Sequence, residues 1–275
     1  MIEKLRGKNM ADILMMAKRR YRRLFPLRYP SPLEYAERIR SLRNKYQGER
    51  CFIIGNGPSL NAFDIKILNN EYTFGVNSIF FKTDDTGFRP TFYAVEDHFV
   101  IHDNLKRINA YDCEINFFLA NYKGLVKPKP NVILLPADLG FYRENHPYHD
   151  TPRFSTECDK VIYNGQTVSY INMQLAYWMG FNPVYLVGMD FSYQIPDSLI
   201  KDGINFTSTD DDPNHFHPSY FGKGKRWHDP QLDRVAMNFE LAKNVFEKDN
   251  RKILNATIGG QLEIFERVDF FSLFS

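Results

Sequence analysis

Short apolar segments alternate with amphipathic segments along most of this 275-residue chain. Such apolar runs, bounded by polar or glycine-bearing turns, are typical of strands that are buried on both faces. The predicted strands cover residues 51–54, 72–76, 91–95, 115–119, 132–135, 184–187 and 253–255. The helical patterns cover residues 32–46, 60–69, 98–108, 166–180 and 230–249. Strands that alternate with helices imply a mostly parallel sheet with helices on both faces, which is a Rossmann-like α/β fold.

The start of the first of these helices carries a capping signal. Ser31 is followed three residues later by Glu34, the spacing of a capping box. We therefore predict that the helix over 32–46 begins with a hydrogen bond from the backbone amide of Glu34 to the Ser31 side chain.

Residues 1–30 form a separate and strongly basic unit. Nine Lys and Arg residues stand there against Glu3 and Asp12, a net charge of +7. The whole chain has a formal net charge of +2, so residues 31–275 carry −5. Apolar residues recur at three- and four-residue steps, which predicts an amphipathic helix that Pro26 ends.

A basic amphipathic helix of this kind suits an anionic membrane surface, and the alternative is a helix that packs on its own domain or on another subunit of a homo-oligomer. Nucleic acid is not an expected partner, because the rest of the chain is acidic and contains no nucleic-acid-binding motif. We therefore expect residues 31–275 to form one domain behind this helix.

The cysteines and the hydropathy indicate the compartment. Cys51, Cys113 and Cys158 are odd in number, and their spacing fits neither a disulfide framework nor a zinc site. No apolar run is long enough to span a membrane, and no signal-peptide core is visible. These features predict a cytoplasmic protein that is peripheral on the inner face of the plasma membrane.

A glycine-bearing turn follows the first predicted strand and is the first chemical signal. In Gly55-Asn56-Gly57-Pro58-Ser59 the two glycines permit a close backbone approach, and Pro58 suits a first helical turn. Ser59 is placed to cap the following helix, whose free N–H groups would face a phosphate. The third glycine of a dinucleotide fingerprint and the Lys of a P-loop are both missing, so a nucleotide is predicted but its type is not.

Polar residues also follow several other strands, at the sheet edge where ligands of α/β proteins bind. Asn77 ends the second predicted strand, Asp97 follows the third, and Asp190 follows the strand at 184–187. Asp97 is expected to position an acceptor or a ribose hydroxyl. Gly165, Gln166 and Thr167 precede the helix at 168–180, and they are expected to bring its N-terminal amides to the nucleotide.

The polar segment over about 194–229 is too long for a plain connection and is predicted to be an active-site lid. It holds His215, His217 and His228, and Asp229 follows the last of these. An imidazole can remove a proton from an acceptor hydroxyl, and His228 is the first choice for this base, followed by His217.

The lid also carries the basic residues Lys223, Lys225 and Arg226, which could stabilise a departing phosphate. A metal ion is not expected. The alternative is Mg²⁺ or Mn²⁺ bound by Asp210 and Asp212 of an Asp-x-Asp motif in the same lid.

The order of these motifs carries a resemblance over about 50–269. The turn at 55–60, the Phe-Gly-Val-Asn run at 74–77, and the segment at 175–181 leading into Val-Gly-Met-Asp-Phe at 187–191 resemble the bacterial MptE-like family. That family is named after an archaeal 6-hydroxymethylpterin diphosphokinase. The same order of motifs is similar to bacterial sialyltransferases of the Campylobacter lipooligosaccharide type.

The sialyltransferase resemblance implies metal-independent, inverting transfer from a CMP-activated nonulosonic acid. It implies in turn that residues 31–275 form a nucleotide-sugar-binding catalytic domain. It implies that Asn56, Gly57, Ser59 and Asn77 hold the nucleotide. It also implies that Tyr193, and Tyr220 in the lid, contact the leaving phosphate. Lys223 stands where that family has its base histidine, which is a departure from the pattern.

Three functions follow as hypotheses. The first is a glycosyltransferase that uses a CMP-sugar and modifies a glycan or lipid-linked glycan in lipopolysaccharide or capsule biosynthesis. The second is an MptE-like pyrophosphokinase that uses ATP and Mg²⁺. The third is a non-catalytic nucleotide-binding module in glycan assembly. The basic N-terminus favours the first hypothesis, because lipid-linked acceptors lie at the membrane.

Overall fold

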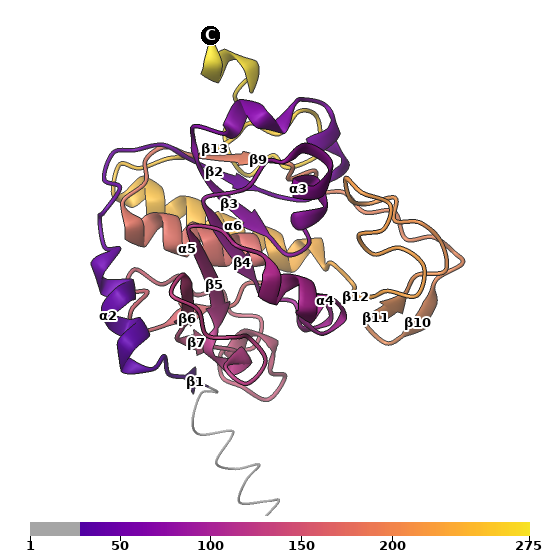
Figure 1. The fold of residues 1–275 in the computed structure, drawn as a ribbon, viewed down its shortest axis with the longest axis horizontal. Coiled ribbons are helices and arrows are strands. Elements are labelled where there is room, and N and C mark those ends of the chain that lie inside the picture. Colours follow the sequence, from indigo (N-terminus) through magenta and orange to yellow (C-terminus); the bar gives the residue numbers. More distant parts are fainter. Residues whose placement is uncertain (1–27) are drawn as a thin grey trace, which may run out of the picture.

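The computed structural model describes residues 28–275 and is built on one seven-stranded sheet (Figure 1). All neighbouring strands are parallel, in the order β13-β9-β2-β3-β4-β5-β6. The strands are β2 (Cys51–Ile54), β3 (Tyr72–Val76), β4 (Phe92–Val95), β5 (Ile115–Leu119), β6 (Val132–Leu135), β9 (Val184–Val187) and β13 (Ile253–Asn255). The predicted strand ranges are confirmed, with a difference of one residue at the start of β4.

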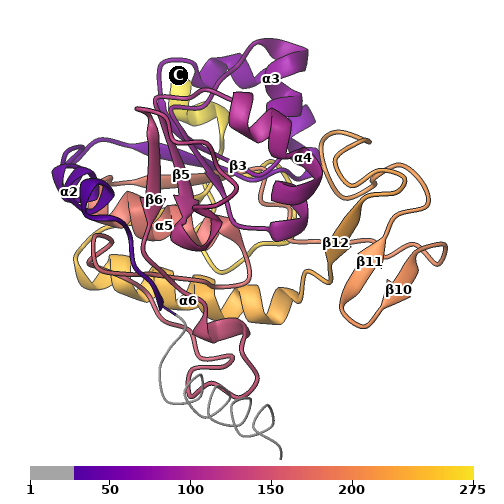
Figure 2. The same ribbon diagram turned by 60° about the horizontal axis from the view of Figure 1, so that its bottom comes forward.

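Helices cover both faces of the sheet, so the Rossmann-like prediction is confirmed. They are α2 (Leu33–Ser41), α3 (Phe80–Thr86), α4 (His98–Ala110), α5 (Val168–Met179) and α6 (Leu232–Lys248). Figure 2 shows α5 and α6 together on one side of the sheet, with α3 and α4 on the other. The connections change direction at β2, since β3 lies on one side of it and β9 on the other. A crevice at the carboxyl ends of these strands is the expected ligand site.

Aromatic side chains fill much of the core around the sheet. Every residue of β2, β4 and β9 is buried, as expected for strands that are covered on both faces. Phe74 and Phe92 pack with ring centroids 4.6 Å apart, and Tyr46 stacks on Phe181 at 4.8 Å. Much of the aromatic content of the chain therefore stabilises the sheet.

Two local predictions are wrong. The segment predicted as a helix over 60–69 forms two short 3₁₀ helices, η2 (Pro58–Asn61) and η3 (Ile65–Leu68), because Asp64 begins the second one by accepting a bond from the amide of Lys66. The capping box is also absent. Pro32 precedes α2 without a side-chain cap, and the Ser31 hydroxyl instead donates to the carbonyl of Leu134 at 2.5 Å.

Two small sheets accompany the main one. Strands β1 (Arg28–Tyr29), β7 (Ala137–Asp138) and β8 (Ile162–Tyr163) form the first. Strands β10 (Ile200–Asp202), β11 (Asn205–Thr207) and β12 (Arg226–His228) form the second, which lies within the predicted lid. In Figure 1 the lid projects from one side of the main body, and β12 contacts α4.

Nearly all of the predicted basic helix over 1–30 falls on residues 1–27, which lie outside the described part of the chain. Among residues 28–275, no helix is both long enough and apolar enough to cross a membrane. All three cysteines are buried and free.

Candidate functional site

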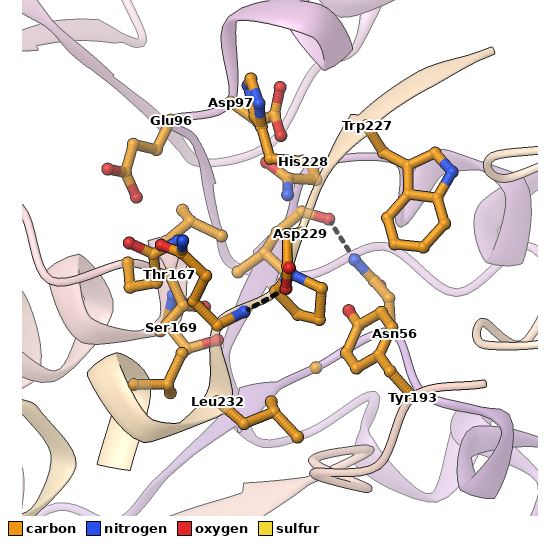
Figure 3. Close-up of a pocket in the computed structure, with 18 of the residues that line it drawn as sticks. Asn56, Glu96, Asp97, Thr167, Ser169, Tyr193, Trp227, His228, Asp229 and Leu232 are labelled. Carbon is orange, nitrogen blue, oxygen red and sulfur yellow. Dashed lines mark hydrogen bonds between the residues drawn. The ribbon is translucent and has the colours of Figure 1, made fainter. Parts of the chain in front are cut away.

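A pocket of about 600 Å³ lies at the carboxyl ends of the strands next to the change of direction. This volume is in the range of ordinary small-molecule sites. Thirteen of the predicted site residues line it, namely Gly55, Asn56, Gly57, Asn77, Asp97, Gln166, Thr167, Asp190, Tyr193, His215, Tyr220, His228 and Asp229. Figure 3 shows that the strand ends supply one wall, the start of α5 another, and the lid a third.

The turn after β2 is held by the loop after β9. The amide of Gly55 donates to the carbonyl of Val187 at 2.8 Å, and the amide of Gly57 donates to Gly188 at 2.9 Å. A Cβ atom on Gly57 would collide with the carboxylate of Asp190. Glycine is thus required by close approach of the two loops.

Ser59 does not have its predicted role. Its hydroxyl donates to Asp190 Oδ2 at 2.6 Å and its amide to Asp190 Oδ1 at 3.2 Å. Neither Ser59 nor Pro58 lines the pocket, and the element they enter is a single 3₁₀ turn. The predicted helix N-terminus for a phosphate is therefore not formed here.

Asn56 and Asn77 face the pocket with unsatisfied oxygen atoms. Asn56 donates from Nδ2 to the carbonyl of Val76 at 3.0 Å and to the Tyr220 hydroxyl at 2.8 Å. Among the described residues, its Oδ1 and the Oδ1 of Asn77 are buried without a hydrogen-bond partner. Buried polar atoms are usually paired, so these oxygens are available to the hydroxyl or amino groups of a ligand.

The wall of the pocket at α5 also has buried side-chain oxygens without hydrogen-bond partners among the described residues. Thr167 caps the helix by accepting from the amide of Ser169 at 3.3 Å, and both residues line the pocket at the N-terminus of α5. Gly165 does not line the pocket, and a Cβ atom there would collide with Tyr170 and Asn238. The side-chain oxygens of Asn164 and Gln166 are buried and have no partner within residues 28–275.

Glu96 is a buried carboxyl group in the same wall. Its Oε1 accepts from the Tyr142 hydroxyl at 2.5 Å and from the Asn164 amide. Burial raises the pKa of Glu96, and the hydrogen bonds from Tyr142 and Asn164 oppose this effect. Glu96 at the end of β4 therefore offers a carboxyl group that gains a proton more readily than an exposed one.

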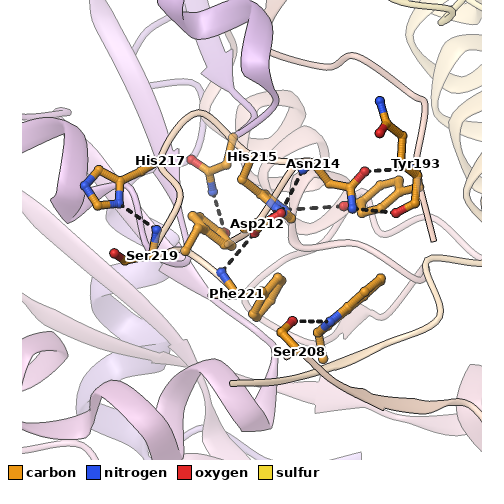
Figure 4. Close-up of polar contacts among 12 residues, drawn as sticks. Tyr193, Ser208, Asp212, Asn214, His215, His217, Ser219 and Phe221 are labelled. Carbon is orange, nitrogen blue, oxygen red and sulfur yellow. Dashed lines mark hydrogen bonds and ion pairs between the residues drawn. The ribbon is translucent and has the colours of Figure 1, made fainter. Parts of the chain in front are cut away.

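His215 is fixed by Asp212 in the lid (Figure 4). Its Nδ1 lies 2.7 Å from Asp212 Oδ2, and its ring stacks on Tyr220 with centroids 4.0 Å apart. The bond from His215 lowers the pKa of Asp212 against the opposing effect of burial. The Nε2 atom of His215 lies 3.5 Å from the Tyr193 hydroxyl, and both residues line the pocket.

His217 does not line the pocket. It stacks on Phe81 with centroids 4.5 Å apart, and its Nδ1 accepts from the amide of Ser219. The expectation that His217 acts on a substrate is therefore wrong, because its ring belongs to the packing between the lid and α3.

The three lid cations also lie elsewhere than predicted. Lys225 reaches Asn104 at 3.5 Å, and Arg226 reaches Asp103 at 3.4 Å and covers the ring of Phe99. Lys223 is exposed. Lys225 and Arg226 thus attach the lid to α4, and among the described lining residues Arg234 supplies the positive guanidinium instead.

His228 lies against the N-terminus of α4 at the edge of the pocket. Its Nδ1 lies 2.9 Å from Asn205 Oδ1, and its Nε2 lies 3.4 Å from Nδ1 of His98. Burial lowers the pKa of His98.

Asp97 begins α4 by accepting from the amides of Phe99 and Val100, both through Oδ1. Asp229 likewise accepts from the amide of Gln231 at 3.0 Å.

The Asp-x-Asp motif is used inside the lid. Asp212 accepts from the amides of Asn214 and Phe221 as well as bonding His215, so both of its oxygens are engaged. Asp210 bonds Ser198 and Thr209. Neither carboxylate lines the large pocket, so the structure gives no support to the alternative metal site.

Many lining residues were not among the predicted site residues, and the polar ones include Glu96, Asn121, Tyr142, Asn164 and Arg234. Glu96 and Asn164 do follow predicted strands or precede a predicted helix, which is the signal that could have identified them. Asn121 and Tyr142 lie in short 3₁₀ segments with no such signal.

Comparison with known proteins gives one family. The family model described as "6-hydroxymethylpterin diphosphokinase MptE-like" matches residues 31–196. No curated protein sequence matches the chain significantly.

Two solved structures are similar to this fold. The MAf glycosyltransferase from Magnetospirillum magneticum AMB-1 has a TM-score of 0.49 and 14% identity, and the match covers 87% of this chain and 38% of that one. The sialyltransferase CstII from Campylobacter jejuni, in complex with the substrate analogue CMP-3FNeuAc, has a TM-score of 0.43 and 17% identity over 80% of this chain and 86% of that one. The present chain thus spans well under half the length of the Magnetospirillum protein.

Proposed function

We propose that this chain, which belongs to the 6-hydroxymethylpterin diphosphokinase MptE-like family, transfers a sugar from a nucleotide-activated donor to a glycan acceptor. The observation that carries the proposal is the pocket at the carboxyl edge of the sheet. Strand ends supply uncommitted amide oxygens there, and the lid supplies His228. We infer further that the donor is a CMP-activated nonulosonic acid, as the order of the sequence motifs implies.

The polar lining supports a donor rich in hydroxyl and amino groups. Buried side-chain oxygens of Asn56, Asn77, Asn121, Asn164 and Gln166 surround the cavity without partners among residues 28–275. A ribose, a cytosine amino group and a sugar all offer the hydrogen-bond donors that such oxygens need.

The positive charge of the pocket lining supports a donor with one phosphate group better than a donor with a diphosphate. Arg234 is the lone Lys or Arg side chain among the described lining residues, and it already forms an ion pair with Asp150 at 2.5 Å. Its Nε is buried without a partner among the described residues, so it can still donate to a phosphate oxygen. A diphosphate would bring more negative charge than this wall can balance.

His228 is the base in the proposed reaction. The Asn205 oxygen accepts from Nδ1–H, so the lone pair on Nε2 is free to take a proton. As the acceptor hydroxyl oxygen bonds to the anomeric carbon, the bond from that carbon to the phosphate oxygen breaks. CMP leaves with the electron pair, and the hydroxyl proton passes to Nε2. Attack on the face opposite CMP inverts the anomeric centre.

We further propose that the basic residues at the N-terminus hold the protein on the inner face of the plasma membrane, where lipid-linked acceptors lie. Each basic residue near an anionic surface contributes about 1 kcal/mol. Deletion of residues 1–27, which leaves β1 in place, should abolish sedimentation with anionic liposomes. Binding that survives this deletion would contradict the proposal.

Ligand-induced stabilisation tests the donor class. A ligand that binds only the folded state raises its stability by RT ln(1 + [L]/Kd). We expect CMP to raise the Tm of the full chain more than UDP or GDP does, without added metal. Stabilisation by ATP with Mg²⁺ but not by CMP would favour the pyrophosphokinase alternative and overturn the proposal. Binding of CMP without transfer to any acceptor would favour the non-catalytic module.

A further inference from the structure

Asp97, His98 and His228 bring three metal-ligating atoms together at the edge of the pocket. One ligand atom from each residue lies within 4.8 Å of the others. We propose that these three residues bind a divalent transition-metal ion of the zinc class, with the remaining coordination position open to the pocket. This site is separate from the Asp-x-Asp motif and lies in the same pocket as the proposed donor site.

The distance between the two imidazoles fits such an ion. Nδ1 of His98 and Nε2 of His228 are 3.4 Å apart. Two nitrogens that each lie about 2.0–2.1 Å from a tetrahedral zinc ion are about 3.3–3.4 Å apart. A direct N–H···N hydrogen bond would bring them closer, near 3.0 Å. The observed spacing therefore fits a shared cation.

The surrounding residues already orient the ligands. Asn205 Oδ1 lies 2.9 Å from Nδ1 of His228 and accepts its proton, which leaves the Nε2 lone pair directed at His98. Such an outer contact is the usual partner of a metal-bound histidine. The His228 ring also stacks on Phe99 with centroids 4.5 Å apart. The lid and α4 thus hold the two imidazoles in place before any ion arrives.

Asp97 supplies the third ligand without losing its structural role. Its Oδ1 caps α4 through the amides of Phe99 and Val100, and Oδ2 can bind a cation. Figure 3 shows Asp97 and His228 next to each other on the same side of the pocket. Two imidazoles and one carboxylate favour Zn²⁺, Co²⁺ or Ni²⁺ over Mg²⁺ and Ca²⁺, which prefer oxygen ligands.

A metal ion at this site would affect the reaction proposed for the pocket. A metal ion on Nε2 of His228 uses the same lone pair that removes the acceptor proton in the proposed reaction. Zinc is therefore expected to inhibit transfer, and EDTA to restore it. This inhibition rests on the proposed function, whereas metal binding itself does not, so the two can fail separately.

Cobalt binding to the full chain tests the site directly. After treatment with EDTA and its removal, Co²⁺ titration should give the intense visible absorption of a tetrahedral ion at one equivalent. Zn²⁺ should displace it. The variants His98→Ala, His228→Ala and Asp97→Asn should each weaken Zn²⁺ binding at least tenfold by calorimetry. Asparagine also caps helices, so Asp97→Asn keeps α4 intact.

Two other histidines make the test specific. His217→Ala removes a lid histidine outside the pocket and should leave Zn²⁺ affinity unchanged. His102 lies one turn after His98 on α4, and His102→Ala should also have no effect. Loss of binding in His102→Ala but not in His228→Ala would place the ion on the surface of α4 and overturn the proposal. Weak, octahedral Co²⁺ absorption in the wild-type chain would overturn it as well.

Discussion

The carboxylate of Asp190 accepts both the hydroxyl and the amide of Ser59, at 2.6 Å and 3.2 Å, and so joins the loop after β9 to the turn after β2. These two residues are 131 positions apart in the sequence. The contact fixes Gly57 at the floor of the pocket, because that residue lies directly against Asp190. The shape of the pocket therefore depends on this pair of side chains.

Removing this contact should destabilise the fold. We expect Asp190→Ala to lower the free energy of unfolding by about 1.5–3 kcal/mol, the cost of losing hydrogen bonds to a charged group. Urea unfolding measures this change in the free energy of unfolding. Asp211→Ala changes an exposed carboxylate of the lid and should leave the free energy of unfolding unchanged. Equal stability of the two variants would contradict the role assigned to Asp190.

Asn121 should matter for the ligand and not for the fold. Its buried Oδ1 lines the pocket and makes no hydrogen bond with residues 28–275. Asn121→Ala should therefore weaken donor binding by about 1 kcal/mol, roughly fivefold, while the Tm without ligand stays the same or rises. Calorimetry with CMP and a thermal melt without it measure the two effects. A lower Tm with unchanged CMP affinity would mean that Asn121 is structural.

Glu96 gives a pH dependence of stability with a defined sign. Its pKa is raised by burial above the ordinary value of 4.5, so folding favours the protonated form. The stability that this provides is fully present below pH 4.5 and is lost as the pH rises through the folded pKa. Glu96→Gln keeps the acceptor for Tyr142 and removes the charge.

We therefore expect Glu96→Gln to be more stable than the wild type at pH 7, with a difference that shrinks as the pH falls toward 4. Urea unfolding at several pH values checks this. Glu114→Gln, at an exposed position, should show no such trend. A Glu96→Gln variant that is less stable at pH 7 would show that the carboxylate is favoured in the folded protein.

The lid residues His228 and His217 should differ in their effect on catalysis. His228→Ala should lower kcat by about 10²–10⁴, the usual contribution of a general base. His217→Ala should retain wild-type kcat, since its ring packs on Phe81 away from the pocket. The pair is a matched comparison within one lid, and equal losses in both variants would assign the effect to lid packing.

The sequence allowed the sheet and the position of the pocket to be predicted, but not the partners of the lid residues. Apolar runs such as 72–76 and 115–119 identified strands because burial on both faces leaves a local pattern. Residues that follow these strands, such as Asn77, could then be assigned to the edge of the sheet at the carboxyl ends of the strands. Arg226 could not be assigned in this way, because only the docking of β12 on α4 places it beside Asp103, 123 positions earlier.

The same limit applies to Glu96 and Asn164. These two residues are hydrogen-bonded although they lie 68 positions apart in the sequence, and no local sequence pattern predicts this contact. The error at Ser59 has another origin. The turn after Gly57 closes as 3₁₀, with the amide of Ala62 bonded to Ser59, so the expected α-helix never starts.

Release of CMP from a CMP-activated nonulosonic acid tests the central claim most directly. The purified full chain should release CMP when a glycan acceptor is present, should do so with EDTA, and should lose this activity in His228→Ala. Absence of acceptor-dependent CMP release, together with formation of AMP from ATP and Mg²⁺ on a pterin substrate, would contradict the account.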